Sequence, residues 1–196
     1  MNNITTKKVT VAGLMAALCF AGYAVFPAIS VTGTKIHLGN AFVVLAALLL
    51  GGSYGGLAGA IGLCLADILT GYAASAPRTF ISKLLIGIVV GLIAHKAGKI
   101  KECKDKKRIL LKASLAAIGG LAFNCVFEPA LKYVWYTLLT PNADKAASAI
   151  KSLLAITAWT TVVNSVINAI AAILLFEALL PFIRRMGMWD KDVKKK

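Results

Sequence analysis

The stretch "LAGAIGLCLADILTGYAASAPRTFISKLLIGIVVGLIAH" (residues 57–95) decides the fold, because it joins two long apolar runs through a short turn. Apolar runs approaching 20 residues have the length that crosses a hydrocarbon core roughly 30 Å thick. Asp67, Arg78 and Lys83 stand around the turn, whereas long apolar runs elsewhere carry almost no charge. The stretch therefore predicts a helical hairpin in a membrane, with polar side chains gathered near one end.

Composition extends this interpretation to the whole chain. Its 196 residues are 59% hydrophobic and 15% charged, whereas about a quarter of the residues in a soluble domain are charged. Mean hydropathy is +0.79. These values predict an integral membrane protein. A chain of this length is too short for more than one bundle, so residues 1–196 are expected to form a single domain.

Apolar runs recur on both sides of the opening stretch. Six spans are predicted, over about residues 9–29, 41–50 (a start near 36 also fits), 57–72, 79–95, 109–127 and 152–180. The first run is longer than the apolar part of a secretory signal, so we expect a retained span. Pro129 predicts a break or kink after the fifth span, and residues 130–139 either continue that helix or lie at the interface. The predicted fold class is an all-α membrane protein with six transmembrane helices.

The distribution of basic residues predicts the orientation. Of the 22 Lys and Arg residues, 16 lie near the two termini or in the loop at 95–108 and its flank. The positive-inside rule places such residues in the cytoplasm. We therefore expect a multi-pass plasma-membrane protein with cytoplasmic N- and C-termini, a basic cytoplasmic loop at 95–108 and a basic tail at 184–196. The bases flank apolar runs rather than lining one folded face, so no nucleic-acid partner is expected. They are expected to border the lipid bilayer.

Glycines gather in and around the second, third and fourth spans. They are Gly51, Gly52, Gly55, Gly56, Gly59, Gly62, Gly87 and Gly91. Residues this small let helix backbones approach closely in lipid, so we predict tight helix packing here.

Polar side chains from several spans fall at one depth, when depth is counted at about 1.5 Å per helical residue. A charge inside a span is costly unless it is paired or hydrated, and it marks a functional site by default. We therefore predict an outward-facing ligand site. Its candidate substrate-binding residues are His37, Asn40, Asp67, Tyr72, Lys83, Asn124, Glu128, Trp159 and Asn164. Lys35 and Arg78 are expected to be solvated.

Structural roles remain open for several of these residues. Asp67 and Lys83 also fit an ion pair across the hairpin. Glu128 also fits a helix end before a proline. Trp159 also fits a lipid-facing residue of an aromatic belt.

A catalytic or metal site is not expected. His37 and His95 lie at opposite ends of the predicted bundle, and no Ser–His–Asp set or carboxylate pair assembles at one depth. No Walker motif is present. The four cysteines form no CxxC pair and lie apart from His37, so no metal ligand set is indicated. We expect a protein that is not an enzyme and that needs no cofactor.

Residues 36–95 resemble the substrate-binding S components of energy-coupling factor (ECF) transporters. The resembling features are "LGN" (38–40) entering the second span, the turn "GGSYGG" (51–56), "LADILTGY" (65–72), and a proline-led turn into a lysine-bearing helix. Together with the six-span layout, the resemblance covers most of the chain.

The resemblance implies a six-helix subunit that binds a vitamin. Such a subunit works with a transmembrane coupling subunit and two cytoplasmic ATPase subunits, which supply the energy. It also implies a site near the outer face, capped by residues 30–40 as a gate. An Ala-x-x-x-Ala face on the first helix would engage the coupling subunit, and the chain offers Ala12–Ala16 and Ala17–Ala21.

The substrate stays open at this stage. The polar candidates suit a small polar heterocycle, with an aromatic residue available for stacking. Pyridoxine and the hydroxymethylpyrimidine precursor of thiamine are the favoured substrates, and riboflavin and other water-soluble vitamins fit as well. The alternative is a membrane scaffold or assembly protein that binds no small molecule.

Overall fold

The computed structural model describes residues 3–24, 29–31, 34–139, 147–185 and 189. Its elements are α1 (Asn3–Ala24), β1 (Ile29–Val31), β2 (Thr34–Ile36), α2 (Gly39–Leu50), α3 (Gly52–Leu69), η1 (Ala73–Ser75), α4 (Ala76–Gly91), η2 (Leu92–Ala97), η3 (Ile100–Glu102), α5 (Lys106–Leu139) and α6 (Ala147–Arg185). The π-helix η2 directly continues α4. In the described ranges, α1, α3, α4 with η2, α5 and α6 are long and apolar enough to cross a membrane, and α2 is a shorter apolar helix.

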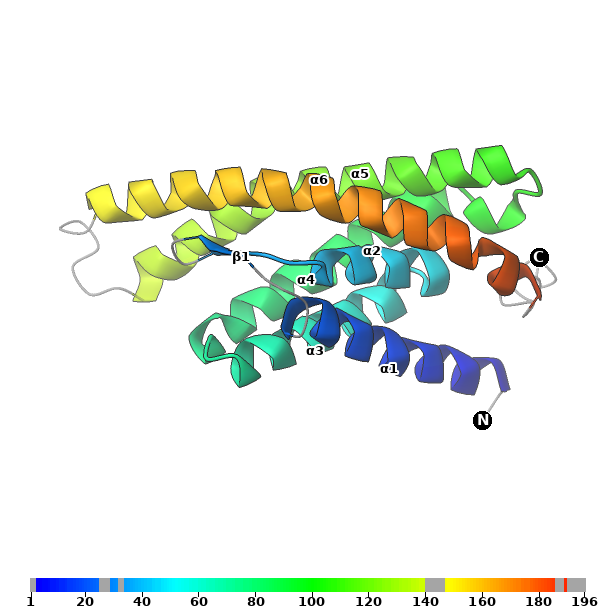
Figure 1. Cartoon of the computed structure of the whole chain (residues 1–196), viewed down its shortest axis with the longest axis horizontal. Coiled ribbons are helices and arrows are strands. Elements are labelled where there is room, and N and C mark those ends of the chain that lie inside the picture. Colours follow the sequence, from blue (N-terminus) through cyan, green and yellow to red (C-terminus); the bar gives the residue numbers. More distant parts are fainter. Residues whose placement is uncertain (1–2, 25–28, 32–33, 140–146, 186–188, 190–196) are drawn as a thin grey trace.

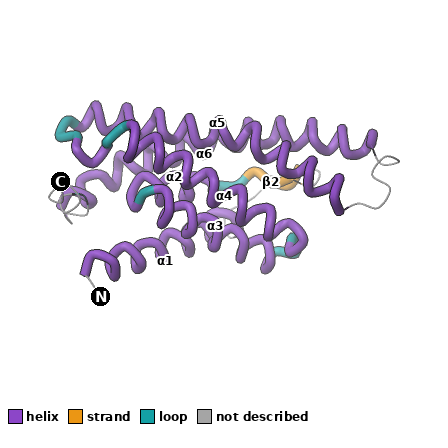
Figure 2. The backbone as a smooth tube through the Cα atoms, turned by 180° about the vertical axis from the view of Figure 1, so that it is seen from behind, coloured by secondary structure: helices purple, strands orange, loops and turns teal. Residues whose placement is uncertain are grey.

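The long helices lie roughly along one axis, with α5 and α6 on one side of the short α2 and α1 and α3 on the other (Figure 1). The first residues of α1 and the last residues of α6 lie at one end of the bundle, together with the turn between η2 and α5. The turn between α3 and α4 lies at the opposite end (Figures 1 and 2). This arrangement agrees with the alternating topology predicted for the spans, and the side of the membrane that each end faces stays a prediction.

Helix α2 forms the centre of the bundle. Every residue of α2 except Phe42 is buried. A helix that is apolar all round is stable only when neighbours cover it on every side, and here five other helices pack around it. The chain enters α2 from an antiparallel hairpin in which Ile29 pairs with Ile36 and Val31 with Thr34.

Glycines set the closeness of α3 to its neighbours, as predicted. A Cβ atom on Gly87 of α4 would overlap Gly56 of α3, and a Cβ on Gly91 would overlap Gly52. A Cβ on Gly62 would overlap the carbonyl oxygen of Ala16 in α1. The absence of side chains at these positions therefore fixes the spacing of the α3–α4 hairpin and of α1 beside it.

The break that was one predicted outcome at Pro129 does not occur, because α5 runs through that residue to Leu139, and the predicted continuation over residues 130–139 is confirmed. A proline removes one backbone hydrogen bond, whereas ending the helix in an apolar environment leaves several backbone groups without partners. Continuation of the helix is therefore the less costly choice, and it brings Lys132 into the bundle.

Two other predictions differ at their edges. Helix α1 ends at Ala24 rather than near residue 29, and the predicted gate at 30–40 falls on the β1–β2 hairpin and the start of α2. Residues 32–33 of that gate, and most of the basic tail at 184–196, lie outside the described residues.

Candidate functional site

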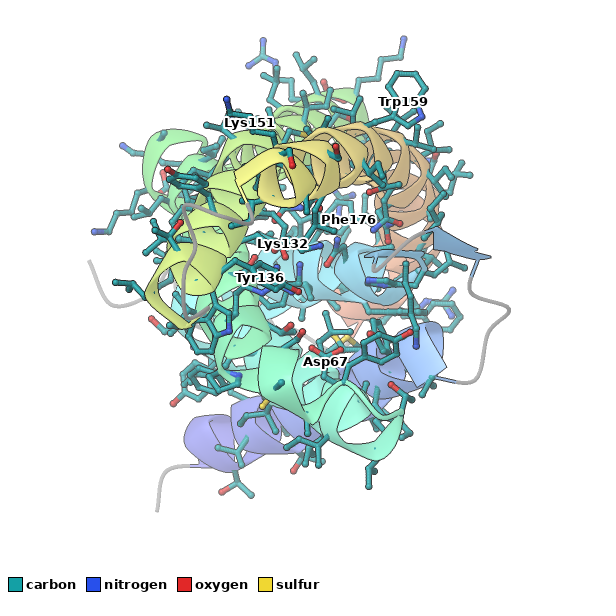
Figure 3. All side chains as sticks on the ribbon, turned by 90° about the vertical axis from the view of Figure 1, so that its left-hand side faces the viewer. Asp67, Lys132, Tyr136, Lys151, Trp159 and Phe176 are labelled. Atoms are coloured by element: carbon teal, nitrogen blue, oxygen red, sulfur yellow. The ribbon has the colours of Figure 1, made fainter. Side chains whose placement is uncertain are left out.

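A cavity opens among the helices toward the end of the bundle that carries η1 and the β1–β2 hairpin. It encloses an empty volume of about 710 Å³, counting the open solvent at its mouth. Residues from every long helix, and from β2 and η1, line it: Tyr23, Lys35, His37, Asn40, Leu63, Asp67, Tyr72, Ser75, Arg78, Thr79, Lys83, Asn124, Glu128, Lys132, Thr157, Thr160, Thr161 and Asn164. In the view along the bundle, Asp67 and Lys132 point toward its middle from different helices (Figure 3).

Asp67 links three helices on one wall of the cavity. Its carboxylate accepts hydrogen bonds from the hydroxyl of Tyr23 on α1 at 2.6 Å and from the hydroxyl of Thr79 on α4 at 2.5 Å. The residue is only 4% exposed. Because both carboxylate oxygens are engaged, Asp67 is held in one position by neighbours that carry no positive charge.

Glu128 joins α5 to α4 on the opposing wall. Its carboxylate pairs with Arg78 at 3.0 Å and with Lys83 at 3.4 Å, and it accepts a hydrogen bond of 2.6 Å from Ser82. Arg78 and Lys83 are both buried. One carboxylate therefore serves two buried cations.

These contacts exclude one of the two roles that the sequence left open for Asp67 and Lys83, the ion pair across the α3–α4 hairpin. Asp67 and Lys83 do not pair with each other: Asp67 takes hydroxyl donors and Lys83 turns to α5. Arg78, which was expected to be solvated, is 8% exposed because α4 begins at Ala76 and places it in the first helical turn against Glu128.

Two asparagines of α6 hold the entrance to α2. Asn164 accepts the backbone N–H of His37 at 3.1 Å, and Asn168 accepts that of Ala41 at 2.7 Å. The Asn168 amide also donates to the His37 carbonyl at 2.8 Å. The first turn of a helix leaves backbone N–H groups short of partners. The Ala41 N–H, which also donates to the Leu38 carbonyl at 3.0 Å, gains a second acceptor from another helix in Asn168.

His37 is a neutral side chain in this setting. Burial, together with the charges of Lys83 and Lys35, lowers the pKa of His37 to about 3. Its Nδ1 accepts the backbone N–H of Gly39 at 3.0 Å, so the ring proton lies on Nε2. The His37 ring also meets the Tyr23 ring edge to face, with centroids 4.5 Å apart.

Two polar groups at the cavity lack the partners usual for their type. The Asn40 side-chain oxygen is buried and has no hydrogen-bond partner within the described structure. The Lys35 ammonium lies over the rings of Tyr23 and Tyr72, 4.7 and 4.2 Å from their centroids, and was expected to be solvated. Such contacts hold a cation in place without neutralising its charge.

The structure gathers eight of the nine candidate substrate-binding residues around this cavity: His37, Asn40, Asp67, Tyr72, Lys83, Asn124, Glu128 and Asn164. Trp159 is the exception, because it is 70% exposed and lies at the rim of the bundle (Figure 3). That position matches the lipid-facing alternative for Trp159.

Sequence reasoning missed several lining residues that helical spacing would have revealed. Asn124, Glu128 and Lys132 recur every four residues and therefore share one face of α5. Lys132 is 1% exposed and donates to the Thr157 hydroxyl at 2.9 Å. The lining residues Thr157, Thr160, Thr161 and Asn164 form a similar polar stripe on α6.

The arrangement suits reversible binding of a polar molecule. Its walls offer cations, amides, hydroxyls and aromatic rings from several helices, which are the groups that orient a ligand in a pocket. Among the described residues, no group of three or more His, Cys, Asp or Glu is placed to hold a metal ion.

Comparisons with known proteins agree with one another. A family model described as "ECF-type riboflavin transporter, S component" matches residues 3–180. A UPF0397 protein of Exiguobacterium sp. (strain ATCC BAA-1283 / AT1b) is 31% identical over 140 residues, covering 69% of this chain and 74% of that protein. The crystal structure of the S-component for biotin from an ECF-type ABC transporter has a TM-score of 0.61 and 23% identity, covering 95% of this chain and 93% of that one. The last likeness shows a shared fold.

Proposed function

The chain belongs to the family of S components of ECF-type riboflavin transporters, and from this premise we propose that it binds a water-soluble vitamin or vitamin precursor for import. The chain itself supplies the binding site. A transmembrane coupling subunit and two cytoplasmic ATPase subunits supply the energy. The protein works in the plasma membrane with the cavity facing outward and both termini in the cytoplasm.

The observation that carries this proposal is the cavity itself. A carboxylate or ammonium in a membrane-spanning helix is costly unless it is paired or hydrated, and it marks a functional site by default. Here charged side chains from α3, α4 and α5 converge on one cavity. The side-chain oxygen of Asn40, which also lines this cavity, has no hydrogen-bond partner among the described residues. A scaffold protein has no need of such a space, whereas a polar ligand would satisfy its lining.

The test is ligand binding by the purified chain alone. We expect the chain in detergent or nanodiscs to bind at least one member of a panel of B vitamins and precursors at micromolar concentration or below. The readouts are the thermal-unfolding temperature and mass spectrometry of small molecules that co-purify with the protein. The absence of binding across the whole panel would instead favour the scaffold alternative.

The exposure of the α1 alanines favours one of the two candidate Ala-x-x-x-Ala pairs for the proposed contact with the coupling subunit. Ala16 lies against Gly62 of α3, and Ala12 is partly buried against the core. Ala17 is exposed, and Ala21 is partly buried on the same side of the helix. Of the two candidate pairs, we therefore propose Ala17–Ala21 for the contact with the partner.

Ala17→Leu is expected to abolish co-purification with the coupling subunit while leaving ligand binding unchanged, because a larger side chain keeps the partner helix from approaching closely. Ala122→Leu, at an exposed alanine of α5, is the matched control. Equal complex formation by the two variants would contradict the assigned face. The measurement is pull-down of the coupling subunit alongside a binding titration.

A further inference from the structure

We propose that the ligand of this cavity is a small organic anion that bears a carboxylate or phosphate group and also offers an N–H or O–H donor. The inference rests on the proposed function and specifies the substrate class, which neither the family match nor the fold determines.

The first step is the charge of the lining. Lys35, Arg78 and Lys83 face a cavity whose only carboxylates among the lining residues are Asp67 and Glu128. Positive charges outnumber negative ones even without counting Lys132. In a cavity partly withdrawn from water, an excess of one charge attracts a ligand of the opposite sign.

The second step is that both carboxylates are already occupied. Asp67 accepts from the hydroxyls of Tyr23 and Thr79, one on each oxygen. Glu128 uses one oxygen for Arg78 and the other for Ser82 and Lys83. A cationic ligand therefore finds no carboxylate oxygen without a protein donor in the cavity.

The third step is that the cations retain donors. Among the described residues, the Lys83 ammonium pairs only with Glu128, at 3.4 Å, although an ammonium has three N–H groups. The Lys35 contacts are the faces of two tyrosine rings, which neutralise no charge. Anionic oxygens form short, strong hydrogen bonds with such donors. Lys35 on β2 and Lys83 on α4 thus form a place for the anionic group.

One acceptor in the cavity lining lacks a hydrogen-bond donor from the described part of the chain. The Asn40 side-chain oxygen, in the first turn of α2, is buried at the cavity without a donor. A buried acceptor left unsatisfied is rare in folded proteins and costs stability. Because Asn40 lines the cavity, a rotation of its amide would let an N–H or O–H group of the ligand satisfy this oxygen. The anionic group and this donor together define a ligand with two distinct polar ends.

Matched pairs of molecules test the inference. Nicotinate with nicotinamide and biotin with biotinamide differ at a carboxylate, whereas riboflavin 5′-phosphate with riboflavin and pyridoxal 5′-phosphate with pyridoxal differ at a phosphate. Each is titrated against the wild-type chain in nanodiscs by calorimetry or thermal shift. We expect one pair in which the anionic member binds at least tenfold more tightly. The pair that shows this preference identifies carboxylate or phosphate as the group.

Variants locate the charge that makes the distinction. Lys35→Met and Lys83→Met are each expected to weaken binding of the anionic member about tenfold or more and to leave that of the neutral member within about twofold. Lys35 is on the hairpin, so its replacement provides a folded variant if Lys83→Met fails to fold. Lys151→Met is the control, because Lys151 is exposed and does not line the cavity (Figure 3).

The outcomes separate this inference from the proposed function. Equal or tighter binding of the neutral member in every pair that binds would overturn the anion inference and keep the vitamin-binding proposal. An anion preference that Lys35→Met and folded Lys83→Met both leave unchanged would overturn the assigned place for the anionic group. Failure of every pair and of the whole vitamin panel would overturn the proposed function itself.

Discussion

Replacing Glu128 with glutamine is expected to lower the free energy of unfolding by about 3 kcal/mol, the lower end of the cost of leaving a buried charge without its partner. The variant keeps the shape of the side chain but removes the carboxylate that, within the described part of the chain, pairs with both Arg78 and Lys83. The carboxylate is 15% exposed, so solvent replaces little of the lost interaction. Reversible unfolding in mixed detergent micelles, followed by circular dichroism, measures the change.

Glu177→Gln is the matched control for that experiment. Glu177 pairs with Lys106 at 2.8 Å, a shorter contact than either made by Glu128, but its side chain is 43% exposed and that of Lys106 is 57% exposed. Exposed pairs contribute roughly 0.2–1 kcal/mol. The same chemical change should therefore have a far smaller effect at Glu177. Equal losses at the two positions would show that burial does not set the strength of the Glu128 cluster.

The second large effect is expected from Gly87→Ala, which should lower the free energy of unfolding by about 2 kcal/mol, within the range for an overpacked core. The added methyl group would overlap the Cα atom of Gly56 and come within 2.6 Å of its nitrogen. Both are backbone atoms, so the overlap is relieved only by moving α3 away from α4. The same unfolding measurement applies.

Gly13→Ala provides the comparison. Gly13 is also a helical glycine, but a Cβ atom there meets nothing within 4 Å. Alanine favours helix over glycine by roughly 1 kcal/mol at an unstrained position, so this variant should be neutral or slightly more stable. A loss of stability at Gly13 similar to that at Gly87 would contradict the steric account.

The helices were predictable because apolar length is a strong signal in a membrane chain. The resemblance to ECF S components, based on residues 36–95, is confirmed by the family match over residues 3–180. The sequence left the continuation of α5 beyond Pro129 open as one of two outcomes. Local rules could not decide between them, since the rule for proline assumes that water can satisfy the freed backbone groups. Within an apolar environment that assumption fails.

The site was predictable in its membership but less so in its pairing. Depth counting brought Asp67, Lys83 and Glu128 to one level, and the structure places all three around one cavity. Pairing depends on which way each helix is turned about its axis, and that rotation is set by contacts between helices. The early start of α4 at Ala76 turns Arg78 inward, a detail that neither composition nor spacing contains.

On the proposed function, the shortness of α2 limits the distance over which a ligand has to be moved. Twelve residues at 1.5 Å each extend about 18 Å, whereas the hydrocarbon core is roughly 30 Å thick. The first turn of α2, with Asn40, forms part of the cavity wall, so the cavity lies at one end of a helix that is about 12 Å shorter than that core. On the proposed function, a ligand bound in the cavity is separated from the opposite end of the bundle mainly by the length of α2.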